Sequence, residues 1–287
     1  MKIGIIGLGL IGGSLGRTIV KKREDEVYAF DISNKAMLDG KLLSAYHHHL
    51  GEENVSEMDM VIFCLYPNAL EDALDKYCPL LKDGCIVLDC SGNKRRIVNQ
   101  MQRLSKKFDN LNFISAHPMA GREFSGVTHS TINLFEKASM ILVPVCQSIQ
   151  VLSFVKEFTL SLGFGSVVIT NAKEHDKIIA YTSQLAHIVS SSYIKSPTAS
   201  QFMGFSAGSF RDMTRVARLS PEMWAQLTLD NADFLVEEID NIIDNLSQYK
   251  LTLQQGDKEK MKQLLEEGNQ KKLSCEKIRR ATQNENV

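Results

Sequence analysis

A glycine-rich turn near the N-terminus places the strongest constraint on what this chain can fold into. Residues 7–12 read Gly-Leu-Gly-Leu-Ile-Gly, directly after the apolar run 2–6 and before a stretch with helical periodicity. Glycines at this spacing allow a tight turn, a close approach of the backbone to a pyrophosphate, and a helix N-terminus that favours the anion. We therefore predict a dinucleotide site formed by Gly7, Leu8, Gly9, Leu10, Ile11 and Gly12.

An acidic residue follows the second predicted strand. The run 27–30 ends at Asp31, which lies 19 residues beyond Gly12. A carboxylate at this point can accept hydrogen bonds from the adenosine ribose hydroxyls, and it repels a 2′-phosphate. We therefore expect NAD rather than NADP as the cofactor, although Lys35 lies close enough in the sequence to weaken this preference.

The chain divides into two parts with different patterning. Short Val- and Ile-rich runs alternate with helical stretches up to about residue 171, which is typical of a mainly parallel sheet covered by helices on both faces. We expect an α/β chain, with an N-terminal Rossmann-type domain over residues 1–171 and a C-terminal all-helical dimerisation domain over residues 172–287. The predicted strands are residues 2–6, 27–30, 60–64, 86–89, 112–115, 139–143 and 166–169.

The second part carries helical patterns only. One runs from residue 174 to 194, and Ser220-Pro221 is typical of a helix start, with Ser as N-cap and Pro at the first helical position. A last helix is expected over residues 257–272, followed by a disordered polar tail. After residue 220 the apolar stripe is larger than a monomeric domain of this size needs, which favours a homodimer. Its residues are Trp224, Leu227, Phe234, Leu235, Ile239, Ile242, Ile243 and Leu246.

The composition excludes several classes of partner. Lys and Arg number 33 against 34 Asp and Glu, so a net charge of −1 provides no general attraction to nucleic acid or anionic lipid. The sequence has no apolar run of about 18 residues and no signal-peptide pattern at its start. We therefore expect a cytoplasmic protein that binds a small molecule, with neither nucleic acid nor membrane as a partner.

Three other clusters favour structural interpretations. The six cysteines contain no CxxC pair, and the side chains of His47-His48-His49 would fan outward rather than converge, so no metal site is expected. We interpret the histidines as a solvated loop. The basic residues Lys94, Arg95, Arg96, Arg103, Lys106 and Lys107 are interpreted as the solvated face of one helix.

Two candidate catalytic residues follow predicted strands. Ser91 comes directly after strand 86–89, at the carboxyl edge where open α/β sheets place their ligands. His117 follows strand 112–115 and precedes a Pro-Gly turn. Imidazole exchanges protons near neutral pH, so His117 is the candidate base for a substrate hydroxyl. A structural histidine bonded to a loop carbonyl is the alternative.

Further candidates lie in the helical part. Ser183 and His187 are four residues apart and share one helix face. The segment 208–215 combines small residues with Arg211, Asp212 and Arg215, and the planar fork of arginine suits a substrate carboxylate. The alternatives are a buried structural role for His187 and a solvated helix start for the arginines.

Taken together, these segments resemble the prephenate/arogenate dehydrogenase family over roughly residues 1–245. The resemblance rests on residues 7–14, 117–126, 183–187 and 208–215, followed by Trp224. It implies NAD-dependent oxidative decarboxylation of prephenate to 4-hydroxyphenylpyruvate, in which the ring becomes aromatic as CO2 departs. It also implies a homodimer with intertwined helical domains, in which Arg215 serves its own or the neighbouring site.

The resemblance also implies roles for single residues. His117 matches the catalytic histidine that binds the substrate hydroxyl, and Ser91 matches a serine that positions this histidine and the nicotinamide. Arg215 matches the binder of the side-chain carboxylate. The remaining implied residues are the substrate-binding Ser183, His187, Gly208 and Trp224, and an ionic gate of Glu123 and Asp212.

Three other functions stay open at this point. An arogenate dehydrogenase would use the same residues. Other dehydrogenases of the β-hydroxyacid type usually place a catalytic lysine on the first long helix of the second domain, where this chain has Lys173 and Lys177. A non-catalytic NAD sensor is the alternative outside enzymes.

Overall fold

The computed structural model describes residues 1–122, 124–145 and 148–284. Residues 1–235 form one compact unit, and residues 236–287 form a second. The predicted boundary at residue 171 falls inside the first unit and stays a prediction. None of the helices in the described ranges is long and apolar enough to cross a membrane.

The first unit is built on one eight-stranded sheet with the strand order β3-β2-β1-β4-β5-β6-β7-β8. Neighbouring strands are parallel, except that β6 and β7 are antiparallel. The mainly parallel Rossmann-type sheet is therefore confirmed. The strands are β1 Lys2–Ile6, β2 Glu26–Phe30, β3 His48–His49, β4 Met60–Phe63, β5 Ile86–Asp89, β6 Asn112–Pro118, β7 Ser139–Pro144 and β8 Ser166–Ile169.

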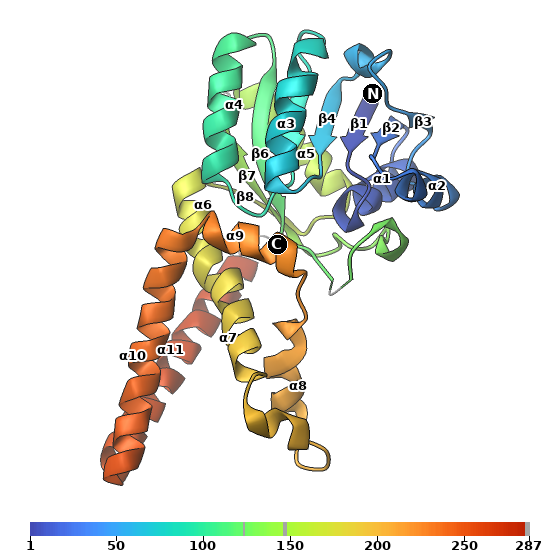
Figure 1. The fold of residues 1–287 in the computed structure, drawn as a ribbon. Helices are drawn as coiled ribbons and strands as arrows, with labels where there is room; N and C mark the ends of the chain where they lie inside the picture. The colour runs from blue at the N-terminus through green and yellow to red at the C-terminus, as the bar shows by residue number, and fades with distance from the viewer. Residues whose placement is uncertain (123, 146–147, 285–287) are drawn as a thin grey trace. The chain divides into compact units, whose positions relative to one another are not determined.

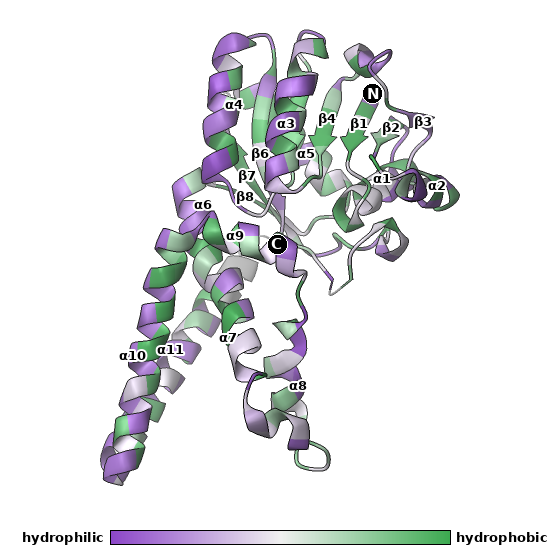
Figure 2. Ribbon diagram, in the orientation of Figure 1, coloured by the Kyte–Doolittle hydropathy of each residue, from purple (hydrophilic) through white to green (hydrophobic). Residues whose placement is uncertain are grey.

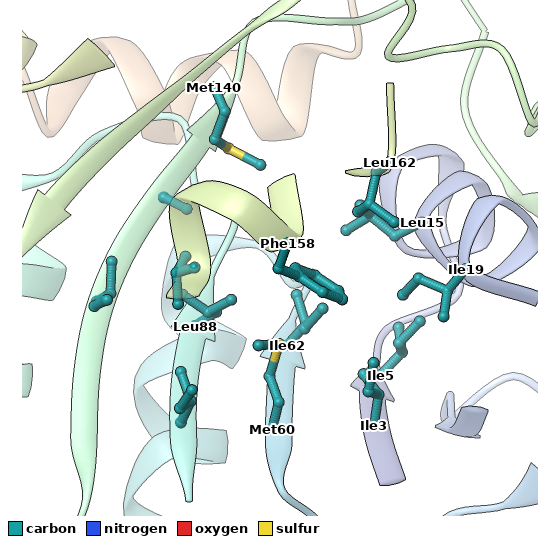
Figure 3. Close-up of a cluster of buried hydrophobic side chains, with 14 of the residues drawn as sticks. Ile3, Ile5, Leu15, Ile19, Met60, Ile62, Leu88, Met140, Phe158 and Leu162 are labelled. Atoms are coloured by element: carbon teal, nitrogen blue, oxygen red, sulfur yellow. The ribbon is translucent and has the colours of Figure 1, made fainter. Parts of the chain in front are cut away.

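Helices cover both faces of this sheet. Alternate strand residues point to opposite sides and pack against the helices on each face. Ile62 joins a buried cluster with residues of α1 and α5, whereas its neighbours Val61 and Phe63 join a second cluster with residues of α3 and α4. Figure 3 shows the first cluster, in which Phe158 of α5 packs over the strands. These helices are α1 Leu10–Lys22, α2 Asn34–Leu42, α3 Pro67–Tyr77, α4 Arg95–Lys107 and α5 Ile149–Ser161.

The helical part of the first unit begins directly after β8. Helix α6 (Ala172–Ile179) continues through a π-helical turn (Ala180–Leu185) into α7 (Ala186–Tyr193). Helices α8 (Gly208–Thr214) and α9 (Pro221–Leu229) follow (Figure 1). Pro221 occupies the first turn of α9 as predicted.

Two sequence predictions about the last helices are wrong. The stripe after Ser220 is divided between α9 and α10 (Ala232–Gln255), because the chain breaks at Asn231, whose side chain donates hydrogen bonds to distant groups. The segment expected to be a disordered tail continues α11, which spans Lys258–Asn284. Residues 273–284 contain neither Gly nor Pro, and several of them are strong helix formers.

The second unit is a pair of antiparallel helices, α10 beyond residue 235 and α11. The Tyr249 hydroxyl of α10 donates to the Leu264 carbonyl of α11 over 3.1 Å. Apolar side chains stay exposed along α10, where Leu246 is 60% and Leu253 is 70% exposed. Figure 2 shows hydrophobic and hydrophilic residues interspersed along α10, whereas the strands of the first unit are largely hydrophobic.

Candidate active site

The glycine-rich turn has the backbone geometry that the sequence predicts. Gly7 follows β1 with φ of +97°, and a Cβ there would lie 2.5 Å from the Cys64 carbonyl oxygen. A Cβ at Gly12 would lie 1.9 Å from the Gly7 carbonyl oxygen. Both positions therefore require glycine. A Cβ at Gly9 would meet no atom of the described residues within 4 Å, so they leave the backbone at the start of α1 open to a ligand.

The first turn of α1 is suited to an anion. Gly9 is the N-cap and supplies no side-chain cap, so the backbone N–H groups of this turn are available to a phosphate. Leu8 is buried beneath the turn, whereas Leu10 and Ile11 are half-buried. The residues at this turn thus fit the pyrophosphate of a dinucleotide.

Asp31 stands beside this turn, directly after β2. Its Oδ2 accepts the Leu8 backbone N–H over 2.7 Å, and its Oδ1 accepts that of Ser33 over 2.8 Å. These two bonds fix the orientation of the carboxylate and leave each oxygen a further lone pair. The side chain can therefore accept hydrogen bonds from ribose hydroxyls, as the sequence predicts.

A buried ionic network lies at the carboxyl ends of β5 and β6. Lys94 is fully buried, and its Nζ lies 2.7 Å from Asp89 Oδ1 and 2.6 Å from the Ala116 carbonyl oxygen. The Ser115 hydroxyl donates to Asp89 and accepts from Lys94. A buried ammonium requires such a set of partners, because its desolvation is otherwise costly.

The interpretation of the basic cluster is therefore wrong for its first three members. Lys94 is buried, Arg95 pairs with Asp176 and Asp233, and Arg96 pairs with Glu71 and Asp230. The partners of Arg95 and Arg96 lie at least 25 residues away in the sequence, so charge periodicity alone could not reveal them. Arg103, Lys106 and Lys107 are exposed, as expected.

Ser91 belongs to this network rather than to an open cleft. It is buried, and its Oγ lies 2.6 Å from Asp89 Oδ1 and 2.9 Å from the Asn93 carbonyl oxygen. Lys94 Nζ lies 3.1 Å from the same oxygen. Within the described residues His117 is not among its hydrogen-bond partners, so a direct role of Ser91 in positioning His117 stays a prediction.

His117 lies near the carboxyl end of β6 and is half-buried. Burial lowers its pKa well below the ordinary value, and the positive charge of Lys94 lowers it further. The imidazole is therefore neutral near pH 7 and can accept a proton. Its Nδ1 lies 2.9 Å from Nε2 of His175.

His175 and the adjacent Asp176 were missed by the sequence reasoning. Both are buried in α6, and His175 Nδ1 lies 2.7 Å from Asp176 Oδ1. The only local signal was a His-Asp pair at the start of the first helix after the last strand. Lys173 and Lys177, by contrast, are exposed on the same helix, so neither lies at this buried network.

Buried amides join the sheet edge to the helical part. Asn93 Nδ2 donates to the Leu227 carbonyl of α9 over 2.7 Å, and Gln184 Nε2 donates to Asn93 Oδ1 over 3.0 Å. Asn231 Nδ2 donates to Gln184 Oε1 over 2.8 Å. These bonds fix the π-helical turn and α9 at the end of β5.

A second group of predicted residues gathers around His187 of α7. Its Nδ1 lies 2.8 Å from the Val216 carbonyl oxygen, and its ring centroid lies 4.0 Å from that of Trp224. Burial lowers the pKa of His187, and the charge of the adjacent Arg215 lowers it further. Ser183, one turn earlier, is half-buried in the π-helical turn. The structure thus brings His187, Trp224 and Arg215 together.

The remaining candidates lie at the surface or outside the described residues. Gly208 begins α8, and Asp212 lies on the same helix with its side chain 74% exposed. Arg211 Nε lies 3.9 Å from Asp212 Oδ1. Glu123, the other half of the expected ionic gate, lies outside the described residues, so the gate stays a prediction.

Comparison with known families and sequences adds independent findings. A family model described as the nucleotide-binding domain of prephenate dehydrogenase matches residues 15–169, and one described as its dimerization domain matches residues 171–267. Prephenate dehydrogenase of Lactococcus lactis subsp. cremoris is 31% identical over 279 residues, which cover 93% of this chain and 75% of that protein. Cyclohexadienyl dehydrogenase of Zymomonas mobilis is 29% identical over 267 residues, which cover 89% and 90%.

Solved structures share the fold. Prephenate dehydrogenase of Aquifex aeolicus, in complex with hydroxyphenyl propionate and NAD+, superimposes with a TM-score of 0.82 at 23% identity, covering 97% of this chain and 98% of that chain. Arogenate dehydrogenase of Synechocystis gives a TM-score of 0.79 at 22% identity, covering 96% and 99%.

Proposed function

Because this chain belongs to the prephenate dehydrogenase family, we propose that it catalyses the NAD-dependent oxidative decarboxylation of prephenate to 4-hydroxyphenylpyruvate. Family membership makes it an oxidoreductase with a nucleotide-binding domain and a dimerization domain. The choice of prephenate as substrate, and the roles of single residues, are the content of the proposal.

One observation carries the proposal. His117 is a neutral, half-buried imidazole at the carboxyl edge of the sheet, where ligands of open α/β folds bind. A neutral imidazole can accept the proton of the substrate hydroxyl while hydride leaves the same carbon. The proton returns to the oxygen when the ring carboxylate departs as CO2, because the product is a neutral phenol. No net proton is then released.

The glycine-rich turn and Asp31 would hold NAD, as their geometry fits its pyrophosphate and ribose. When bound, NAD supplies the hydride acceptor. The chain itself must orient the substrate so that its hydroxyl meets His117. Orientation of this kind contributes a large part of the rate enhancement in many enzymes.

Arg215 and His187 are proposed to hold the other end of the substrate. The guanidinium offers a planar pair of donors for the side-chain carboxylate, and His187 lies next to it through its contact with the Val216 carbonyl. Trp224, whose ring lies tilted against that of His187, provides an apolar wall for the substrate ring. Ser183 and Gly208 complete the proposed substrate set, with Asp212 and Glu123 as the proposed gate.

A homodimer is part of the same proposal. The match to a dimerization domain supports it, and so do the exposed apolar side chains of α10, which include Val236, Ile243 and Leu246. Such residues are normally covered by a partner.

The test is the formation of NADH by the purified protein, with prephenate and arogenate compared and each combined with NAD and NADP. Turnover of prephenate with NAD supports the proposed reaction, substrate and cofactor. Preference for arogenate would keep the reaction and change the substrate, since the two molecules differ only by an amino group in place of a keto oxygen. Dinucleotide binding without turnover of either would refute the proposed reaction and favour another hydroxy acid or an NAD sensor.

A further inference from the structure

His117, His175 and Asp176 form a continuous row of hydrogen bonds. The distance from His117 Nδ1 to His175 Nε2 is 2.9 Å, and that from His175 Nδ1 to Asp176 Oδ1 is 2.7 Å. His175 is 1% exposed and Asp176 is 0% exposed, so bulk water does not compete for these contacts. The row leads from the sheet edge into the interior of the first unit.

The protonation state of Asp176 determines which nitrogen of each imidazole carries the proton. Besides His175, Asp176 accepts the backbone N–H groups of Lys94 over 2.7 Å and of Arg95 over 2.9 Å, and Arg95 Nε over 3.1 Å. Burial alone would raise the pKa of Asp176, but these hydrogen bonds hold it below the ordinary value. Asp176 is therefore ionised near pH 7 and acts only as an acceptor.

Because Asp176 is ionised, the nitrogen that carries the proton can be assigned in both imidazole rings. Because Asp176 can only accept, the proton of His175 must be on Nδ1. Burial lowers the pKa of His175, so this imidazole is neutral and its Nε2 carries a lone pair. The bond between the two rings then requires His117 to donate from Nδ1. Nε2 of His117 is left with its lone pair free to accept a proton.

We propose that His175 and Asp176 are positioning residues that hold the proton of His117 on Nδ1, so that Nε2 is the proton acceptor in the reaction. This rests on the proposed function, which gives His117 a substrate hydroxyl to deprotonate. As the O–H bond of the substrate breaks, its proton bonds to Nε2 of His117. The Nδ1 proton is then shared with Nε2 of His175, and Asp176 stays ionised. The proton returns to the oxygen when the ring becomes aromatic.

Charge explains why His117 needs this support. The charged groups that face the two imidazoles are Lys94, Asp89 and Asp176, with Arg95 on the far side of Asp176. Lys94 opposes a second positive charge at His117, and Asp89 is already paired with Lys94. Asp176 therefore supplies the negative charge that stabilises the imidazolium through His175, without touching the substrate itself.

Two replacements of His175 separate this role from packing. The amide of Gln reaches the place of Nε2 and can still accept from His117, whereas the amide of Asn reaches only the place of Nδ1 and keeps the contact with Asp176. We expect His175→Asn to lower kcat by roughly ten- to a hundredfold, by analogy with the loss of hydrogen-bond partners that orient metal-bound histidines. The KM for prephenate should change little, and His175→Gln, which keeps the bond to His117 but lacks the contact with Asp176, should recover part of the rate.

The pH profile gives a readout that packing would not change. The acidic limb of kcat reports the protonation of the base. With the bond between His117 and residue 175 broken, protonated His117 is no longer linked to Asp176, while Lys94 still opposes its charge. The limb of His175→Asn should therefore move to lower pH. Equal kcat in wild type and His175→Asn, or equal loss in both variants with an unchanged limb, would overturn the proposal.

Nitrogen-15 NMR of the imidazoles tests the same arrangement without turnover. The chain has seven histidines, and the variant His117→Asn assigns the His117 signals by their loss. We expect wild-type His117 to carry its proton on Nδ1, and His175→Asn to shift that proton toward Nε2. A wild-type His117 protonated on Nε2 would refute the inference. If the expected tautomer is found but neither cyclohexadienyl substrate is turned over, the proposed function fails and the arrangement stands.

Discussion

Replacing Lys94 by Met tests whether the buried ion pair with Asp89 holds the sheet edge together. The methionine has a similar length and can fill the space, but it leaves Asp89 buried with three neutral donors, namely the backbone N–H of Ser91 and the hydroxyls of Ser91 and Ser115. Removing one partner of a buried ion pair typically costs about 3 to 5 kcal/mol, whereas removing both is often nearly neutral. We therefore expect Lys94→Met to lower the free energy of unfolding by about 3 kcal/mol, the lower end of this range, because the three donors remain.

Urea unfolding followed by circular dichroism measures this loss. Two controls define its origin. Lys106→Met changes an exposed lysine of the same helix and should leave the midpoint where it is. The double variant Lys94→Met/Asp89→Asn should recover a large part of the lost stability. A Lys94→Met protein as stable as the Lys106→Met control would show that the pair does not contribute as the structure indicates.

Lys94→Met should also shift the pKa of His117 in a direction that a pH profile can check. Lys94 lowers the pKa of His117, so its removal should raise that pKa toward the ordinary value. As the proposed base, His117 would accept a proton only in its neutral form, so the acidic limb of kcat/KM should move to higher pH. This direction is opposite to the one expected for His175→Asn, so the two variants together distinguish the charge of Lys94 from the support of Asp176. An acidic limb that does not move would refute the electrostatic coupling.

Three further predictions follow from other parts of the molecule. Gly9→Ala should fold normally but weaken NADH binding, measured by fluorescence titration, by roughly tenfold or more, which is about 1.4 kcal/mol. Gly12→Ala, whose Cβ would lie 1.9 Å from a backbone oxygen, should instead lose about 1 to 3 kcal/mol of stability, measured by thermal unfolding. Arg215→Ala should raise the KM for prephenate roughly ten- to a hundredfold with little change in kcat, as expected for a lost charge-assisted hydrogen bond, whereas Arg103→Ala on the exposed face of α4 should change neither constant. Leu246→Lys should shift the protein toward monomer in light scattering, and an unchanged mass would exclude this part of α10 from a dimer contact.

The parts of the fold that the sequence predicts well are set by local physics. All seven predicted strands form, because strands of a sheet appear as short runs rich in Val, Ile and other apolar residues. The glycine-rich turn is recognisable from its own spacing, although the atoms nearest to Gly7 belong to Cys64 and Leu65, directly after β4. The two-residue strand β3 was missed because exposed histidines at a sheet edge carry no such pattern.

These sequence patterns could not predict the buried ionic network. Lys94 appears in the sequence as one more basic residue before an amphipathic helix, yet its backbone N–H and that of Arg95 bond to Asp176, more than 80 residues later. His117 and His175 are separated by 58 residues. A candidate base can be recognised by residue type and by its place after a strand. The partners that set its protonation state come from other elements and require the tertiary structure.

Asp176 links the assembly of the fold to the chemistry of the site. Helix α4 has no side-chain cap of its own, since Lys94 is the N-cap residue and points into the interior. The backbone N–H groups of Lys94 and Arg95 are satisfied instead by the Asp176 carboxylate, which α6 supplies. A carboxylate at a helix N-terminus is favoured both by these hydrogen bonds and by the helix dipole. The interaction that fixes α6 against the sheet therefore also keeps Asp176 ionised, and an ionised Asp176 is what orients His175. On this reasoning His117 becomes a competent base only when α6 is in place, which ties proton transfer to the correct packing of the helical part on the sheet.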